Sequence, residues 1–144
     1  MKRKTACISL LLVIPLLIAM GPLGGQGSPD KIPVPEKKFL ATFIDKDDVV
    51  TECRDTSIEG GTFLEGKRGA GTYAISFENI SHVLFHMNDG KLNGVVKLND
   101  SSIVELALNK DSKAYGRTKF GTFQIRLADL KKIIIGGSAS RRGN

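Results

Sequence analysis

Two stretches of this sequence resemble each other, and their repetition decides the fold. Residues 66–85 read GKRGAGTYAISFENISHVLF, and residues 116–135 read GRTKFGTFQIRLADLKKIII. They align without a gap at an offset of 50 residues. The identical positions are Gly66/Gly116, Gly71/Gly121, Thr72/Thr122 and Ile75/Ile125. Such a repeat predicts two copies of one supersecondary unit, each unable to bury its apolar face alone.

Apolar and polar side chains alternate in the middle of each copy. Tyr73, Ile75 and Phe77 share one face of a predicted strand that Gly71 opens, and the second copy repeats the pattern after Gly121. Alternation with a period of two is typical of a half-buried strand. A short turn and a last strand follow in each copy.

Upstream of this stretch, each copy reads as two strands around a polar turn of four residues. The strands are residues 39–44 and 49–53 in the first copy, and 95–98 and 103–108 in the second, at an offset of 54. The first copy therefore carries about four extra residues, which we place in a loop. Asn88-Asp89-Gly90 joins the copies and is typical of a hairpin turn.

These patterns predict an all-β fold made of two tandem four-stranded β-meander repeats, packed as one small barrel or sandwich. Repeat 1 spans residues 39–87 and repeat 2 spans residues 95–136, within a β domain of residues 39–137. The pattern leaves open whether strands pair within each copy or are swapped between copies.

The flanking segments predict export. Residues 1–28 have the layout of a secretory signal peptide, with three basic residues before an apolar run. That run is shorter than the roughly 20 residues of a membrane-spanning helix, although an uncleaved anchor is the alternative. Residues 29–38 contain three prolines and read as a tether, or as an edge segment lying on the barrel. Residues 138–144 read as a flexible tail.

The net charge and the cysteine content limit the classes of partner and the chemistry to be expected. The formal net charge is +6, but Lys2, Arg3 and Lys4 lie in the targeting segment, which leaves +3 for the remainder. This weak excess, together with export, argues against nucleic acid as a partner. Outside that segment Cys53 is the single cysteine, so it is either buried or paired with another molecule.

Candidate catalytic chemistry is sparse. His82 and His86 are four residues apart, and on a strand that spacing separates them by roughly 13 Å, too far to share one ion. Cys53 and the serines lack the local context of an activated nucleophile. We predict no catalytic residue, no metal site and no cofactor. A small metal-dependent hydrolase using His82, His86 or Cys53 is the least favoured alternative.

A basic turn occurs in both copies. Lys67 and Arg68 in the first copy correspond to Arg117 and Lys119 near the same place in the second. If a pseudo-twofold axis relates the copies, these turns flank one edge of the fold and contact an anionic envelope component. The alternative is ordinary solvated charge in a loop.

Both copies share the pattern G-K/R-x-x-A/F-G-T-Y/F-x-I-x-F/L-x-N/D-I/L-x-x-V/I-x-F/I after their strand–turn–strand segment. Over residues 39–136 this resembles the small β-meander repeats of exported or uncharacterised bacterial proteins, with a shape like SH3 or Sm-like barrels. The resemblance implies a fold and carries over no functional residue.

We therefore expect an exported protein, periplasmic or secreted, that acts as a non-enzymatic binding module of the cell envelope. Its partner is an envelope protein or an anionic envelope polymer, and it contacts the membrane only through the N-terminal segment if that stays uncleaved. The main alternative is a structural subunit that self-associates through strand edges.

Overall fold

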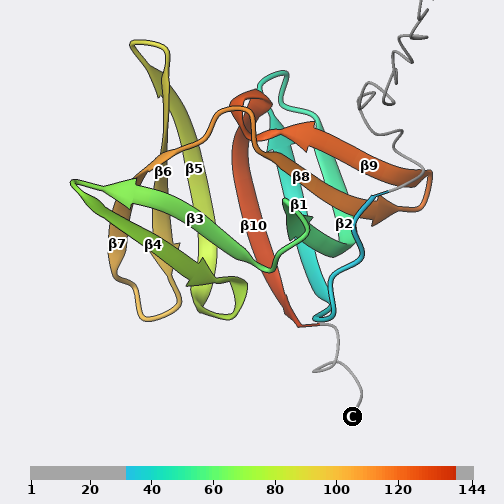
Figure 1. The fold of residues 1–144 in the computed structure, drawn as a ribbon. Coiled ribbons are helices and arrows are strands. Elements are labelled where there is room, and N and C mark those ends of the chain that lie inside the picture. The colour runs from blue at the N-terminus through green and yellow to red at the C-terminus, as the bar shows by residue number, and fades with distance from the viewer. Residues whose placement is uncertain (1–31, 139–144) are drawn as a thin grey trace, which may run out of the picture.

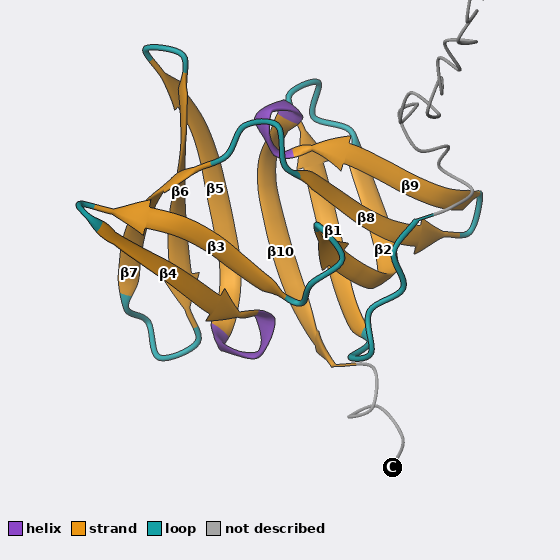
Figure 2. Cartoon of the chain, viewed as in Figure 1, coloured by secondary structure: helices purple, strands orange, loops and turns teal. Residues whose placement is uncertain are grey.

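The computed structural model describes residues 32–138, which form ten antiparallel strands in one curled, half-barrel sheet (Figure 1). The first five strands are β1 (Phe39–Asp45), β2 (Val50–Ile58), β3 (Phe63–Arg68), β4 (Gly71–Ser76) and β5 (Ile80–Asn88). The second five are β6 (Lys91–Leu98), β7 (Ile103–Leu108), β8 (Lys113–Thr118), β9 (Gly121–Arg126) and β10 (Leu130–Ser138). Helical residues occur only as single turns within the described chain, η2 (Phe77–Asn79) and η3 (Leu127–Asp129) (Figure 2).

The all-β prediction is confirmed, but the predicted four strands per copy are wrong. Each half has five strands, because β3 and β8 lie where the sequence was read as loop. Their sequences, FLEGKR and KAYGRT, place a glycine in mid-strand and basic residues at or near the end, which obscures the alternation. Phe77 and Leu127, predicted to end strands, instead begin the 3₁₀ turns.

Strand order shows that the two halves exchange hairpins. The order is β4-β3-β7-β6-β5-β10-β1-β2-β8-β9. Each strand of the first half has a counterpart five strands later in the chain, so that β1 corresponds to β6. Strands at equal distances from the two ends of the sheet are such counterparts, as β4 and β9 are at the edges. The β3–β4 hairpin of the first half pairs with β7 of the second, and the β8–β9 hairpin pairs with β2 of the first. The swapped pairing that the sequence left open is therefore the one observed.

Backbone hydrogen bonds recur at the offset seen in the sequence. The amide of Phe77 donates to the carbonyl of Thr62 at 2.9 Å, and the amide of Leu127 donates to that of Ser112 at 2.8 Å. These bonds fix the start of each 3₁₀ turn against the segment before β3 or β8. The two halves thus share local contacts as well as strand order.

The first two strands of each half match at an offset of 53, so the predicted offset of 54 is wrong by one. Left-handed residues mark the equivalent turn positions, Asp48 (φ 62°) and Ser101 (φ 72°). The first half consequently has three extra residues before β3, and β2 has an irregular register between Arg54 and Ser57. Asp55 adopts φ 51° in this bulge.

The predicted hairpin between the halves is confirmed. Asn88 pairs with Lys91, and the two residues between them, Asp89 (φ 50°) and Gly90 (φ 73°), both adopt positive φ. A two-residue turn with positive φ at both positions matches the right-handed twist of the strands it joins. This turn connects the first half of the chain to the second.

One core cluster runs through both halves. It includes Phe39, which meets Phe77 edge-on with ring centroids 5.6 Å apart, and Phe43, which contacts Phe123 at the same distance. Because Phe77 begins η2 and Phe39 lies on β1, this contact ties that turn to a central strand. The described residues therefore form one domain.

Residues 32–38 lie on this domain instead of extending away from it. Ile32 and Pro35 are buried, and Lys37 forms an ion pair with Glu78 at 2.9 Å. These contacts favour the alternative of a segment lying on the barrel over a tether for residues 32–38. The predicted signal peptide, residues 29–31 and residues 139–144 lie outside the described residues.

Gly66 and Gly116 are repeated because two strands approach closely there. A Cβ atom at Gly116 would lie 2.6 Å from Cβ and 2.8 Å from Sγ of Cys53, and one at Gly66 would lie 2.8 Å from Cβ of Leu106. Neither separation is tolerated in a packed interior. Each glycine lets an exchanged hairpin pack on the half that receives it.

Gly116→Ala is expected to lower the free energy of unfolding by about 1–3 kcal/mol, because the added methyl overpacks against Cys53. Urea denaturation measures the change. Gly71→Ala is the matched control, since its Cβ would meet nothing closer than 3.7 Å. Equal stability of the two variants would contradict the close-approach explanation.

Candidate functional site

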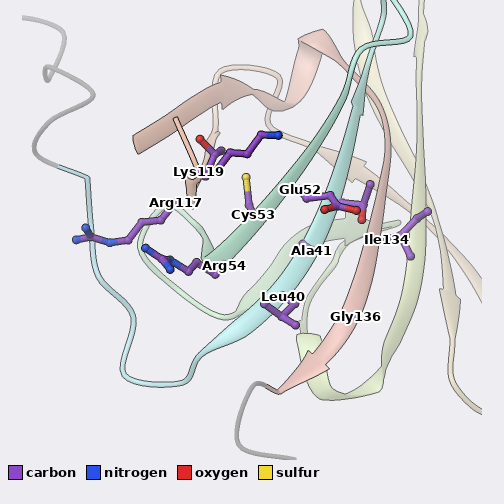
Figure 3. A pocket seen from close by; sticks show the side chains of 11 residues that line it. Leu40, Ala41, Glu52, Cys53, Arg54, Arg117, Lys119, Ile134 and Gly136 are labelled. Carbon is purple, nitrogen blue, oxygen red and sulfur yellow. The ribbon is translucent and has the colours of Figure 1, made fainter. Parts of the chain in front are cut away.

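A groove of about 450 Å³ lies where β2 pairs with the end of β8 (Figure 3). We call it the basic groove. It is formed by β1, β2, β10 and the end of β8 with the turn that follows. Its lining residues are Leu40, Ala41, Thr42, Glu52, Cys53, Arg54, Arg117, Thr118, Lys119, Ile134 and Gly136.

Two arginines face each other across the strands that form this groove. Arg54 on β2 is paired in register with Arg117 on β8, and both side chains extend to the same side (Figure 3). Like charges placed directly opposite on neighbouring strands destabilise the pair. The fold therefore holds two guanidinium groups, each with a rigid fork of donors suited to phosphate or carboxylate, at one place.

Asp55 neutralises this charge only in part. Its carboxylate lies 3.6 Å from Nε of Arg117 and 4.0 Å from Nζ of Lys38, so two cations share one carboxylate. The β2 bulge sets the position of Asp55. Arg54 forms no ion pair with any residue between 32 and 138. A positive excess therefore remains at this end of the groove.

Lys119 adds a third cation at the tip of the β8–β9 hairpin. Its Nζ lies 4.9 Å from the ring centroid of Phe120, which is a cation–π contact. The hydroxyl of Thr118 accepts a hydrogen bond from the amide of Phe120 and donates one to the carbonyl of Gly121, both at 3.0 Å. These bonds hold the turn, and with it the position of Lys119.

Cys53 lies at the floor of the groove as an unpaired, buried thiol. Burial raises the pKa of this thiol to about 12. Because the thiolate is the nucleophilic form of cysteine, the thiol is inert near neutral pH. Its part in the groove is to pack against Gly116.

Both histidines lie on β5, four residues apart and outside the basic groove. Nδ1 of His82 is 3.3 Å from Oγ of Ser81, and Nε2 of His86 is 3.3 Å from Oε1 of Glu105. Burial, and then the charges of Lys132 and Lys97, lower the pKa of His82. Between residues 32 and 138 no group of three or more His, Cys, Asp or Glu side chains is arranged to hold a metal ion.

The predicted basic turns do not share an edge. The turn with Lys67 and Arg68 ends the β3–β4 hairpin at one end of the sheet, and the turn with Lys119 ends the β8–β9 hairpin at the other (Figure 1). The expectation of one joint basic edge is wrong, because the exchanged hairpins are carried to opposite ends. Lys67 instead lines a separate groove of about 570 Å³ beside β7.

Arg54 was missed by sequence reasoning. The predicted second strand ended at Cys53, which placed Arg54 in a loop, whereas β2 continues to Ile58. An exposed residue next to a buried one is the ordinary alternation of a strand and would have extended the prediction. Its pairing with Arg117 depends on the exchanged hairpin, for which the sequence carries no signal.

The chain belongs to the protein family described as "Uncharacterised protein", whose family model matches residues 35–138. A comparison with curated proteins and a comparison with solved structures each found no match. Among the described residues, no helix has the length and apolar content needed to cross a membrane.

The burial of Cys53 predicts that this thiol resists alkylation by iodoacetamide at neutral pH in the folded protein and reacts in urea. Peptide-resolved mass spectrometry distinguishes Cys53 from Cys7. Gly116→Ala, which disturbs the packing over the sulfur, is expected to speed the reaction. Rapid alkylation of the native chain would show an accessible thiolate and would restore Cys53 as a candidate nucleophile.

Proposed function

We propose that this protein is an exported, non-enzymatic binding module of the cell envelope, and that it holds an anionic group of an envelope component in the basic groove. The observation that carries the proposal is the in-register pairing of Arg54 with Arg117, with Lys119 at the end of the same groove. The predicted signal peptide supports export, and the curl of five strands in each half supports the resemblance to small exported β-meander proteins.

An anion between the arginines removes a repulsion that the unliganded fold contains. Hydrogen bonds to charged groups contribute about 1.5–3 kcal/mol each, and the guanidinium fork binds phosphate or carboxylate oxygens in pairs. Asp55 supplies only a long contact to Arg117, at 3.6 Å, so Arg54 is available to a ligand. Binding an anion is the chemistry for which this arrangement is best suited.

Comparison of the two halves shows that two of the three cations of the basic groove have no charged counterpart at the equivalent positions. At the offsets of 50 and 53, Arg54, Lys119 and Gly136 correspond to Ala107, Gly69 and His86. His86 contacts Glu105, whereas Gly136 leaves the equivalent Glu52 open to the groove. Arg117 corresponds to the cation Lys67, so the shared fold accounts for at most one of the three cations, and the other two, Arg54 and Lys119, support a role in binding.

Arg54→Gln tests the proposal through stability. In chloride, the variant should gain about 0.5 kcal/mol in free energy of unfolding, because the like-charge pair is removed. At equal ionic strength, inorganic phosphate should raise the melting temperature of the wild type more than that of the variant. Arg68→Gln, at the opposite hairpin tip, is the matched control for the general effect of phosphate on proteins. An equal rise in melting temperature with phosphate for all three proteins would contradict the proposal.

A second candidate function is self-assembly through strand edges. The sheet does not close, so β4 and β9 each have one unpaired edge. The sequence of β4, GTYAIS, contains no charge and no proline, which are the usual protections of an exposed edge, and its first four residues are exposed. This edge is therefore suited to pairing with another strand.

Ala74→Lys on β4 tests this assembly. If the edge pairs with another copy, the wild type should show a mass in light scattering that rises with concentration, and the lysine should return the chain to a monomer. Gln124→Lys, at the corresponding position of β9, shows whether one edge or both take part. A wild type that stays monomeric at high concentration excludes the assembly role.

A further inference from the structure

The β8–β9 hairpin tip presents an aromatic ring to solvent. Phe120 is 89% exposed, more than any other large apolar side chain that the structure describes. Val49 and Val50, before and at the start of β2, are 54% and 59% exposed. Leaving these apolar surfaces in water is unfavourable, and a contiguous group of them marks an interaction site.

These apolar side chains adjoin the basic groove. A second groove of about 680 Å³ separates the hairpin tip from the start of β2, and it shares Glu52, Thr118 and Lys119 with the basic groove. Phe120, Val49 and Val50 line it. The cations and the exposed apolar side chains therefore form one surface, which we call the tip surface.

Acidic groups on the tip surface are few. Glu52 is the one acidic residue lining both grooves, and Asp48, in the turn before Val49, is ion-paired with Lys131 at 2.6 Å. Asp55, which does not line the basic groove, forms ion pairs with Arg117 and Lys38. Arg54, Arg117 and Lys119 therefore exceed the acidic lining by two charges.

We propose that the tip surface docks onto an anionic lipid bilayer, with the Phe120 ring entering the interface and the three cations contacting the headgroup phosphates. This rests on the proposed function, because the same cations hold the anion, and it names that anion as a lipid headgroup. A hydrophilic polymer would satisfy the cations but leave Phe120, Val49 and Val50 in water. A bilayer surface satisfies both.

The contact between Lys119 and Phe120 fits this orientation. With Nζ 4.9 Å from the ring centroid, the cation lies next to the ring that enters the interface, at the depth of the phosphates. In the other half the equivalent tip residues are Gly69 and Ala70, which offer neither a cation nor an aromatic ring. The opposite hairpin tip keeps Lys67 and Arg68 but has no aromatic ring in its turn.

Phe120→Trp provides a local probe, since the chain contains no tryptophan. Used in the full chain, it reports insertion at residue 120 even if the N-terminal segment also binds lipid. With vesicles of equal parts phosphatidylglycerol and phosphatidylcholine, its emission should shift to the blue and be quenched by brominated lipid. With phosphatidylcholine alone, the shift should be much smaller. Ile103→Trp is the matched control, because Ile103 is 66% exposed and occupies the position of Val50 in the other half.

Adding Arg54→Gln to Phe120→Trp should weaken partitioning into the anionic vesicles about fivefold, the effect of one cation near such a surface. An unshifted spectrum of Phe120→Trp, or an equal shift of Ile103→Trp, overturns the bilayer proposal. If phosphate still stabilises the wild type through Arg54 in that case, the anion-binding function stands without the lipid. If that stabilisation is also absent, both proposals fall.

Discussion

The close approach of exchanged strands at Gly66 and Gly116 is the constraint on which the rest of the structure depends. Each glycine lies on a hairpin that leaves its own half of the chain and packs on the other, against Leu106 or Cys53. Without a side chain there, β3 and β8 reach the neighbouring strand and bury its apolar face. The halves therefore cannot be separated into independent units, and one core runs through both. This explains in physical terms why the repeated unit occurs as a pair.

The same exchange creates the candidate site. Arg117 and Lys119 belong to the second half, whereas Arg54 and Glu52 belong to the first. Only after β8 has crossed onto β2 does Arg117 stand opposite Arg54. The bulge in β2 adds Asp55, whose carboxylate lies 3.6 Å from Nε of Arg117. A groove formed by both halves depends on the full assembly of the domain, so a ligand held there would stabilise the folded chain.

Sequence reasoning succeeded where the physical signal was local. The hairpin at Asp89-Gly90 follows from turn chemistry, and β4, β5 and β9 follow from alternation and from the repeat. It failed for β3 and β8, because a glycine in mid-strand and basic residues at or near the end obscure their alternation. For the site, the sequence identified Arg117 and Lys119 but grouped them with Lys67 and Arg68. That grouping required the location of each hairpin, which long-range pairing decides.

Differences between the halves are more informative about binding than the similarities. Positions that match, such as Gly66 and Gly116, are explained by packing and would be required in any protein with this fold. Positions that differ are free of that requirement, so their chemistry reflects something else. Both hairpin tips carry cations, but the turn of the β8–β9 hairpin has Lys119 and the aromatic Phe120 where the turn of the β3–β4 hairpin has Gly69 and Ala70. The fold keeps the two ends of the sheet alike in backbone, while the β8–β9 end alone joins cations to an exposed aromatic ring in its turn, which is why the proposed anionic partner is placed there.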